Sequence, residues 1–183
     1  MPVIVNSFTP EIVQLLADGK IGIIRTDTLY GVVARADNEA SVERVYRLKH
    51  RTMTKSPIIL ISSQEQLFDQ YDVATLGRLA PLWPGKNSVI LPASAAPEWI
   101  TRGNGSVAYR MPDDSVLREF ISKTGPLIAP SANPEGDPPA MTIDEAVRYF
   151  GEDVDFYVDG GMVTDDAPSK LYRLQEKGME RLR

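Results

Sequence analysis

The chain has 183 residues, a net charge of −5 at pH 7, no cysteine and a single histidine. Without cysteine there is no disulfide framework, thiolate zinc site or thiol nucleophile, and one histidine nearly excludes a Ser-His-Asp triad or a multi-histidine metal site. The acidic balance argues against a dedicated nucleic-acid binder, because such proteins need excess cations to displace counterions. Any chemistry must use carboxylates, lysine, arginine, hydroxyls, backbone amides or a metal carried in by a substrate.

The sequence also bears on location. No stretch approaches the length of a membrane span, and the longest aliphatic run covers only residues 58–61. Residues 1–5 lack the basic region and the long apolar segment of a secretory signal. We therefore expect a cytoplasmic protein with no membrane contact.

Apolar, β-rich runs alternate with segments of helical period, which predicts a mixed α/β sheet. The first helix begins at Thr9-Pro10, which supply a capping hydroxyl and a first-turn proline, and it ends at Gly19. A buried strand over 20–25 and a polar turn over 26–28 follow. Further helices are expected over 39–50, 63–70, 73–82, 113–123 and 142–150. Further strands are expected over 57–61, 88–91, 106–110, 126–129 and 156–158, with a final hairpin of 169–174 and 178–183.

Cations gather between residues 41 and 55, where a single acid, Glu43, accompanies Arg44, Arg47, Lys49, Arg51 and Lys55. A helix that ends in cations and opens onto a loop is a plausible site for phosphates or carboxylates. The alternative is a solvated helix face whose last-turn cations complement the helix dipole. We favour the solvated face for Arg44 and Arg47. We favour the ligand site for the other three, because they continue past the helix.

Polar residues also follow two strands and end a third. Thr26-Asp27-Thr28 follows the strand over 20–25, and residues 129–133 follow another; ligands of open α/β sheets gather at such ends. The alternative is a turn in which the side chains only satisfy local backbone, and for each segment alone this is the simpler interpretation. Arg110 is the only charge in 107–111, so it either clamps a carboxylate or lies at a sheet edge. Standard nucleotide-binding loops are missing.

Together these segments resemble the YrdC/TsaC family of L-threonylcarbamoyladenylate synthases. The family pattern runs P-T-[DE]-T-x-Y-G after a strand, K-x-R before the next, then V-x-R-x-P, P-S-A-N, and a P-S-T-like segment before a terminal I-L-R. Matching segments of this chain, in the same order, are residues 26–31, 49–51 with Lys55, 107–112, 130–133, 168–169 and 181–183. The similarity covers essentially the whole chain, and the combination is specific although no single piece is.

The resemblance implies a YrdC-like α/β fold over residues 1–183 as one domain, with a twisted mixed sheet flanked by helices and enclosing a concave, positively charged cavity. It implies a nucleotidyltransferase that joins L-threonine, bicarbonate and ATP, with Mg²⁺ carried by the ATP, to give threonylcarbamoyl-AMP and pyrophosphate. A downstream threonylcarbamoyl transferase system then modifies adenosine 37 of tRNA. The rival interpretations are a non-enzymatic RNA-binding or ribosome-associated module of the same fold, with weak RNA binding, and a domain that carbamoylates another acceptor.

The family pattern also assigns roles. Thr28, Arg110 and Ser169 would bind threonine, while Lys49, Arg51 and Lys55 would be the catalytic cations on the ATP phosphates. The remaining nucleotide contacts would come from Ser106, Ala129, Ser131, Asn133 and Arg183. No protein ligand for a metal is implied, although Asp27 is a candidate acid on the metal side.

Four departures from the pattern stand out. Arg25 replaces the usual proline, Lys170 replaces the threonine after Ser169, Leu60 stands where some members carry histidine, and residues 134–136 replace x-S-G. Because Arg25 and Lys170 leave the site cationic, we expect ATP binding to survive.

Overall fold

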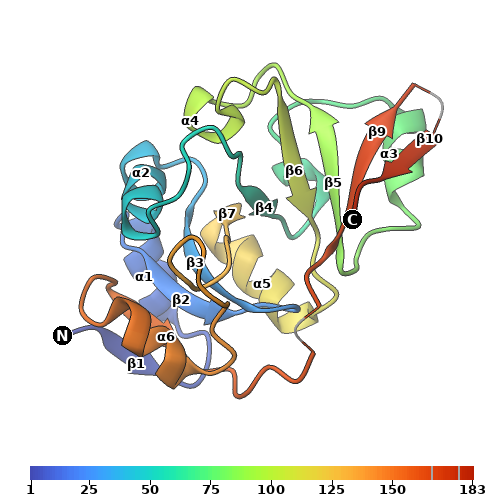
Figure 1. Cartoon of the computed structure of the whole chain (residues 1–183). Coiled ribbons are helices and arrows are strands. Elements are labelled where there is room, and N and C mark those ends of the chain that lie inside the picture. Colours follow the sequence, from blue (N-terminus) through green and yellow to red (C-terminus); the bar gives the residue numbers. More distant parts are fainter. Residues whose placement is uncertain (166, 177) are drawn as a thin grey trace.

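The computed structural model describes residues 1–165, 167–176 and 178–183 and confirms the mixed α/β fold (Figure 1). Its strands form a ten-stranded sheet in the order β1-β8-β2-β3-β7-β4-β6-β5-β9-β10. In chain order the strands are β1 (Val3–Val5), β2 (Gly22–Arg25), β3 (Tyr30–Arg35), β4 (Ile58–Leu60), β5 (Asn87–Pro92), β6 (Ser106–Arg110), β7 (Leu127–Ile128), β8 (Phe156–Val158), β9 (Lys170–Gln175) and β10 (Gly178–Arg181). The helices are α1 (Pro10–Ala17), α2 (Glu39–Leu48), α3 (Val73–Leu79), α4 (Glu98–Thr101), α5 (Ser115–Thr124) and α6 (Ile143–Phe150), with a 3-10 turn at Gln64–Gln66.

The sheet brings distant parts of the chain together. Strand β8 lies between β1 and β2 and runs parallel to both, and β4 pairs in parallel with β6. At the other edge, β9 runs parallel to β5 and antiparallel to β10, as the expected final hairpin requires. In Figure 1 this red hairpin lies beside α3, and Arg78 of α3 donates to the carbonyl of Gln175 at 3.1 Å.

Alternate residues of the central strands enter two different cores, because successive side chains of a strand point to opposite faces. Ile23, Val32 and Ile59 join a cluster with α2, α3, α4 and α6, whereas Ile24 and Leu60 join a cluster with α1 and α5. The sheet is therefore the middle layer between two sets of helices.

Five helices begin at the capping residues that the sequence offers. The side chains of Thr9, Asn38, Asp72, Asp114 and Thr142 each accept a backbone N–H of the first turn. Because those N–H groups have no partner inside the helix, each cap satisfies a donor that is otherwise exposed.

The expected helix over 63–70 is wrong, since only the 3-10 turn forms there. Side chains of this segment instead accept hydrogen bonds from backbone N–H groups. Gln66 Oε1 accepts the N–H of Ser62 at 2.7 Å, and Asp69 accepts those of Ser94 and Ala95 at 2.8 and 2.9 Å. One of these bonds is local and the Asp69 bonds reach a distant loop, and both kinds compete with helical bonds. Strands β1 and β3 and helix α4 were not predicted.

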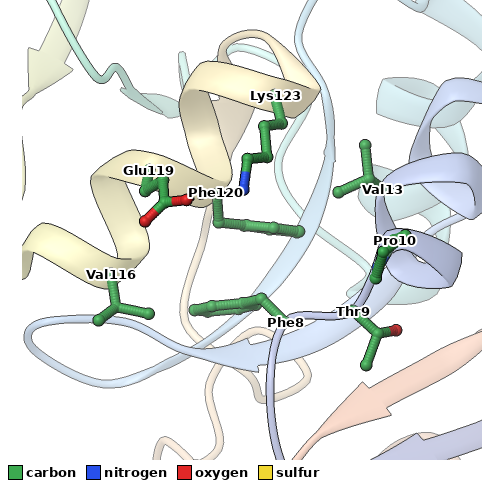
Figure 2. A pocket seen from close by; sticks show the side chains of 8 residues that line it. All are labelled: Phe8, Thr9, Pro10, Val13, Val116, Glu119, Phe120 and Lys123. Atoms are coloured by element: carbon green, nitrogen blue, oxygen red, sulfur yellow. Dashed lines mark hydrogen bonds and ion pairs between the residues drawn. The ribbon is translucent and has the colours of Figure 1, made fainter.

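Helices α1 and α5 enclose an apolar hollow on their side of the sheet. The rings of Phe8 and Phe120 stack there with centroids 4.2 Å apart, and Val13 and Val116 face the same space (Figure 2). The residues predicted to bind ligands lie elsewhere.

Candidate functional site

Two adjoining cavities contain most of the predicted site residues. The inner cavity, of about 280 Å³, is lined by residues that include Thr28, Arg110 and Ser169. The outer cavity, of about 470 Å³, is lined by residues that include Lys55 and Ser106. Arg51, Ile58 and Arg183 line both, so the two form one elongated site. Each volume is on the scale of small-molecule sites, roughly 300–1,000 Å³.

One transverse row of the sheet forms the floor of the outer cavity. Ile58 of β4 pairs with Ala108 of β6, Ala108 pairs with Ile90 of β5, and Ile90 pairs with Arg173 of β9. All four line the outer cavity. The floor is therefore apolar across three strands and ends at a cation on the fourth.

The β2–β3 turn presents threonines to the inner cavity. Thr26 Oγ1 accepts the backbone N–H groups of Thr28 and Leu29 at 3.2 and 3.3 Å. This is the local turn that the sequence left open as an alternative to ligand binding. Thr28 lines the cavity and its hydroxyl lies 3.2 Å from that of Thr26. The turn's local bonding thus fixes the threonine that faces the ligand space.

Arg110 is the buried cation of the inner cavity. It is 5% exposed, its Nη2 lies 3.0 Å from Asp27 Oδ1, and its Nε has no hydrogen-bond partner among the described residues. Burial lowers the pKa of Arg110, and the Asp27 carboxylate opposes that shift. A buried guanidinium with a free donor is suited to bind a carboxylate.

The end of α2 positions Arg51. Arg51 N–H donates to the carbonyl of Tyr46 at 2.9 Å and His50 N–H donates to that of Arg47 at 3.1 Å, with His50 in the left-handed region at φ 51°. These two bonds form a Schellman motif, which ends the helix two residues earlier than predicted. The Arg51 guanidinium then lies 5.5 Å from the centre of the Tyr46 ring and faces both cavities.

Lys49 does not line either cavity. It is 2% exposed, and its ammonium donates to the carbonyls of Ser131 and Asn133. Burial, and secondarily the charge of Arg51, lowers the pKa of Lys49 to about 7. In this structure Lys49 supports the segment 130–133 from behind, and its contact with phosphate stays a prediction.

The segment 130–133 is held against β3. Ser131 forms a bridge with Gly31, and Ala132 N–H donates to the carbonyl of Tyr30 at 2.7 Å. Ala129 and Ser131 line the inner cavity, and their contact with a nucleotide stays a prediction. Asn133 does not, since its amide donates to the carbonyls of Pro134 and Asp137 at 2.9 and 2.8 Å.

The last hairpin closes the site. Arg183 Nε and Nη2 donate to the carbonyl of Ser169 at 3.2 and 3.0 Å, and the hydroxyls of Ser169 and Ser88 lie 2.9 Å apart. Ser169 is buried and Arg183 lines both cavities. Sequence reasoning missed Arg173, because no motif marks a cation in the middle of β9.

Lys55 lines the outer cavity but is ion-paired with Glu135. Glu135 also accepts the backbone N–H of Thr52 at 2.5 Å. These contacts lower the pKa of Glu135 to about 2, chiefly through Lys55. In the sequence, residues 134–136 are marked only as a departure from the family pattern, and no motif marks this carboxylate.

The remaining expectations have mixed outcomes. Arg44 lies outside both cavities as expected, but it is half-buried and pairs with Asp155 at 2.5 Å instead of being solvated. The expectation that Arg25 and Lys170 keep the site cationic is wrong, because neither residue lines either cavity. Arg25 instead donates to the carbonyl of Gly160 at 2.6 Å. Leu60 is fully buried among α5 residues rather than beside the ligand space.

The lining of the site is rich in cations. Among the described residues, both cavities lack a lining carboxylate, and the cations are Arg51, Lys55, Arg110, Arg173 and Arg183. None of the helices in the described ranges is both long and apolar enough to span a membrane.

Comparisons with known proteins agree with this geometry. The Sua5/YciO/YrdC family model, described as "Telomere recombination", matches residues 14–183. Two relatives named "Threonylcarbamoyl-AMP synthase" are those of Pseudomonas fluorescens strain Pf0-1, 33% identical over 80% of this chain and 81% of the relative, and Pseudomonas aeruginosa strain UCBPP-PA14, 32% identical over 86% and 88%. The crystal structure of P. abyssi Sua5 complexed with L-threonine superposes on the whole chain with a TM-score of 0.88 at 28% identity, although this chain spans only 57% of that one.

The match covers nearly all of the sequence, and it includes every segment that lines the two cavities. The chain therefore belongs to the Sua5/YciO/YrdC family.

Proposed function

We propose that this protein is a threonylcarbamoyl-AMP synthase. It joins L-threonine, bicarbonate and ATP to form threonylcarbamoyl-AMP and pyrophosphate, and a downstream transferase system uses the product to make t6A in tRNA. The observation that carries the proposal is the convergence of Thr28, Arg110 and Ser169 in one cavity with Arg51, Lys55 and Arg183 at its junction with a second. The names of the curated relatives and the L-threonine complex of P. abyssi Sua5 support it, and they favour an enzyme over an RNA-binding module.

In the proposed complex, threonine occupies the inner cavity. Arg110 binds its carboxylate through the fork of the guanidinium, Thr28 bonds its polar groups, and Ser169 closes the opposite wall. The amine nitrogen attacks the carbon of bicarbonate and a water molecule leaves, which gives a carbamate. A carbamate oxygen then attacks the α-phosphorus of ATP. The α–β phosphoanhydride bond breaks, and pyrophosphate leaves with the bonding electrons.

ATP lies across the two cavities in this proposal. Arg51, Lys55 and Arg183 contact its phosphates, and Ser106, Ser131 and the backbone of Ala129 contact the nucleotide. Lys49 and Asn133 hold the segment 130–133 in place. Because the carbamate is already a nucleophile, the reaction needs alignment and cations more than a protein nucleophile. Each well-placed donor contributes about 2–4 kcal/mol of transition-state stabilisation.

Mg²⁺ is proposed to enter with ATP. The two carboxylates that are ion-paired with lining cations, Asp27 with Arg110 and Glu135 with Lys55, do not fit a metal held by protein carboxylates. Phosphate oxygens and water are the usual ligands of Mg²⁺ in such sites. Asp27 is therefore not proposed as a metal ligand.

We also propose that residues 1–183 act as one domain and that the protein works in the cytoplasm, where its product meets tRNA. The single ten-stranded sheet supports the first statement.

Pyrophosphate release measured with and without L-threonine and bicarbonate tests the proposed function. We expect release to depend on both, with L-serine a poor substitute. Equal release with serine, or without any amino acid, would remove the threonine assignment. RNA binding that weakens with salt, without ATP turnover, would favour the RNA-binding module instead.

A further inference from the structure

Glu135 holds the cationic loop after α2 at three points. Its backbone N–H donates to the carbonyl of Lys49 at 2.8 Å, its carboxylate accepts the backbone N–H of Thr52 at 2.5 Å, and the same carboxylate is paired with Lys55. The Thr52 hydroxyl lies 3.2 Å from it as well. One side chain therefore contacts both the backbone of the loop and its terminal cation.

The backbone around Lys55 is fixed without the ion pair. The Tyr46 hydroxyl donates to the carbonyl of Lys55 at 2.6 Å, and the Asn104 amide donates to that of Thr54 at 3.0 Å. The Lys55 side chain is 56% exposed. Its ammonium is thus free to change partner while the loop stays in place.

The Lys55 ammonium can pair with either of two anions, the Glu135 carboxylate or a ligand in the outer cavity. It lines the outer cavity, whereas its ion-pair partner Glu135 lines neither cavity. A polyphosphate in the outer cavity would attract the same ammonium and would therefore compete with the carboxylate for it.

We propose that Glu135 is a positioning residue that holds the Lys55 ammonium in the ligand-free protein and yields it to the polyphosphate, so that carboxylate and polyphosphate compete for one cation. This inference rests on the proposed function, in that the outer cavity receives ATP and pyrophosphate. The competition weakens polyphosphate binding and speeds the release of pyrophosphate.

The substitution Glu135→Gln separates charge from shape. Glutamine keeps an oxygen that accepts the Thr52 N–H, but it no longer competes for Lys55 by charge. We expect pyrophosphate and a non-hydrolysable ATP analogue to bind about two- to fivefold more tightly, the scale of an exposed ion pair. A structural defect would weaken binding instead, so the direction of the change is itself diagnostic. Glu119→Gln, which removes the carboxylate of the exposed pair with Lys123, is the matched control and should leave affinity unchanged.

Calorimetric titration of the wild type, Glu135→Gln, Lys55→Met and the double variant completes the test. We expect Lys55→Met to weaken binding and the double variant to match Lys55→Met, because the carboxylate acts through the lysine. Two results would overturn the role of Glu135 while leaving the proposed function intact. One is that Glu135→Gln tightens ligand binding equally in the wild type and in Lys55→Met. The other is that Glu135→Gln does not tighten binding when Lys55 is present. A wild-type protein that binds neither ligand would overturn the proposed function itself.

Discussion

Replacing the buried Lys49 should remove a specific part of the pH dependence of stability. The Lys49 ammonium bridges the carbonyls of Ser131 and Asn133, and burial lowers its pKa from 10.5 to about 7. In Lys49→Met those carbonyls lose their donors, which costs about 1–3 kcal/mol for each buried group. The variant, however, no longer carries the cost of burying a charge.

The sign follows from proton binding. Between pH 7 and pH 10 the unfolded lysine keeps its proton while the folded lysine has lost it, so the unfolded state binds more protons and stability rises with pH. From pH 6 to pH 9 this single group should stabilise the wild type by roughly 2–3 kcal/mol. The carboxylate of Glu135, whose pKa is lowered to about 2 chiefly by Lys55, keeps its charge throughout this range.

Urea denaturation of both proteins at pH 6, 7.5 and 9 measures the effect. We expect the unfolding free energy of the wild type minus that of Lys49→Met to increase by that amount as pH rises. Lys123→Met, at an exposed position of α5, should give a constant difference. A constant difference for Lys49→Met as well would refute the assignment of a neutralised, buried amine.

Three further substitutions test the site and the sheet. Arg110→Lys should raise KM for threonine at least about tenfold while KM for ATP changes little, because lysine cannot form the bidentate contact. Equal effects on both substrates in pyrophosphate-release kinetics would contradict this. Arg173→Ala should raise KM for ATP about two- to fivefold, whereas Lys170→Ala, on the same strand but outside the cavities, should not. The same change in KM for both variants would place Arg173 outside the ATP site. Gly22→Ala should destabilise the fold by about 1–3 kcal/mol in urea melts, because the added Cβ would lie 2.4 Å from the buried Phe156 ring; an unchanged midpoint would show that the ring can move.

Local signals predicted the parts of the fold that depend on local chemistry. The helix that Thr142 caps begins where its hydroxyl bonds the Glu145 N–H, and the final hairpin forms as its pattern indicates. The helix expected over 63–70 failed because Gln66 and Asp69 bond partners that are distant in sequence, including the carbonyl of Ile121. Periodicity within a segment carries no information about such partners.

The site could be predicted residue by residue only where a motif marks it. Thr28, Arg110, Ser131 and Ser169, each marked by a motif, line the inner cavity. Burial was not predictable in the same way: the sequence shows Lys49 as one cation among several, but the fold turns its ammonium toward backbone carbonyls. A motif records which residues are needed and not which of them touches the ligand.

The last hairpin has a consequence for synthesis of the protein on the ribosome. Thr28 emerges early, but Ser169 and Arg183 emerge only with the strand that must pair with β5. Until that strand has paired, the inner cavity lacks Ser169 and Arg183 from its lining. The reactive mixed anhydride would be made only after the last strand has joined the sheet.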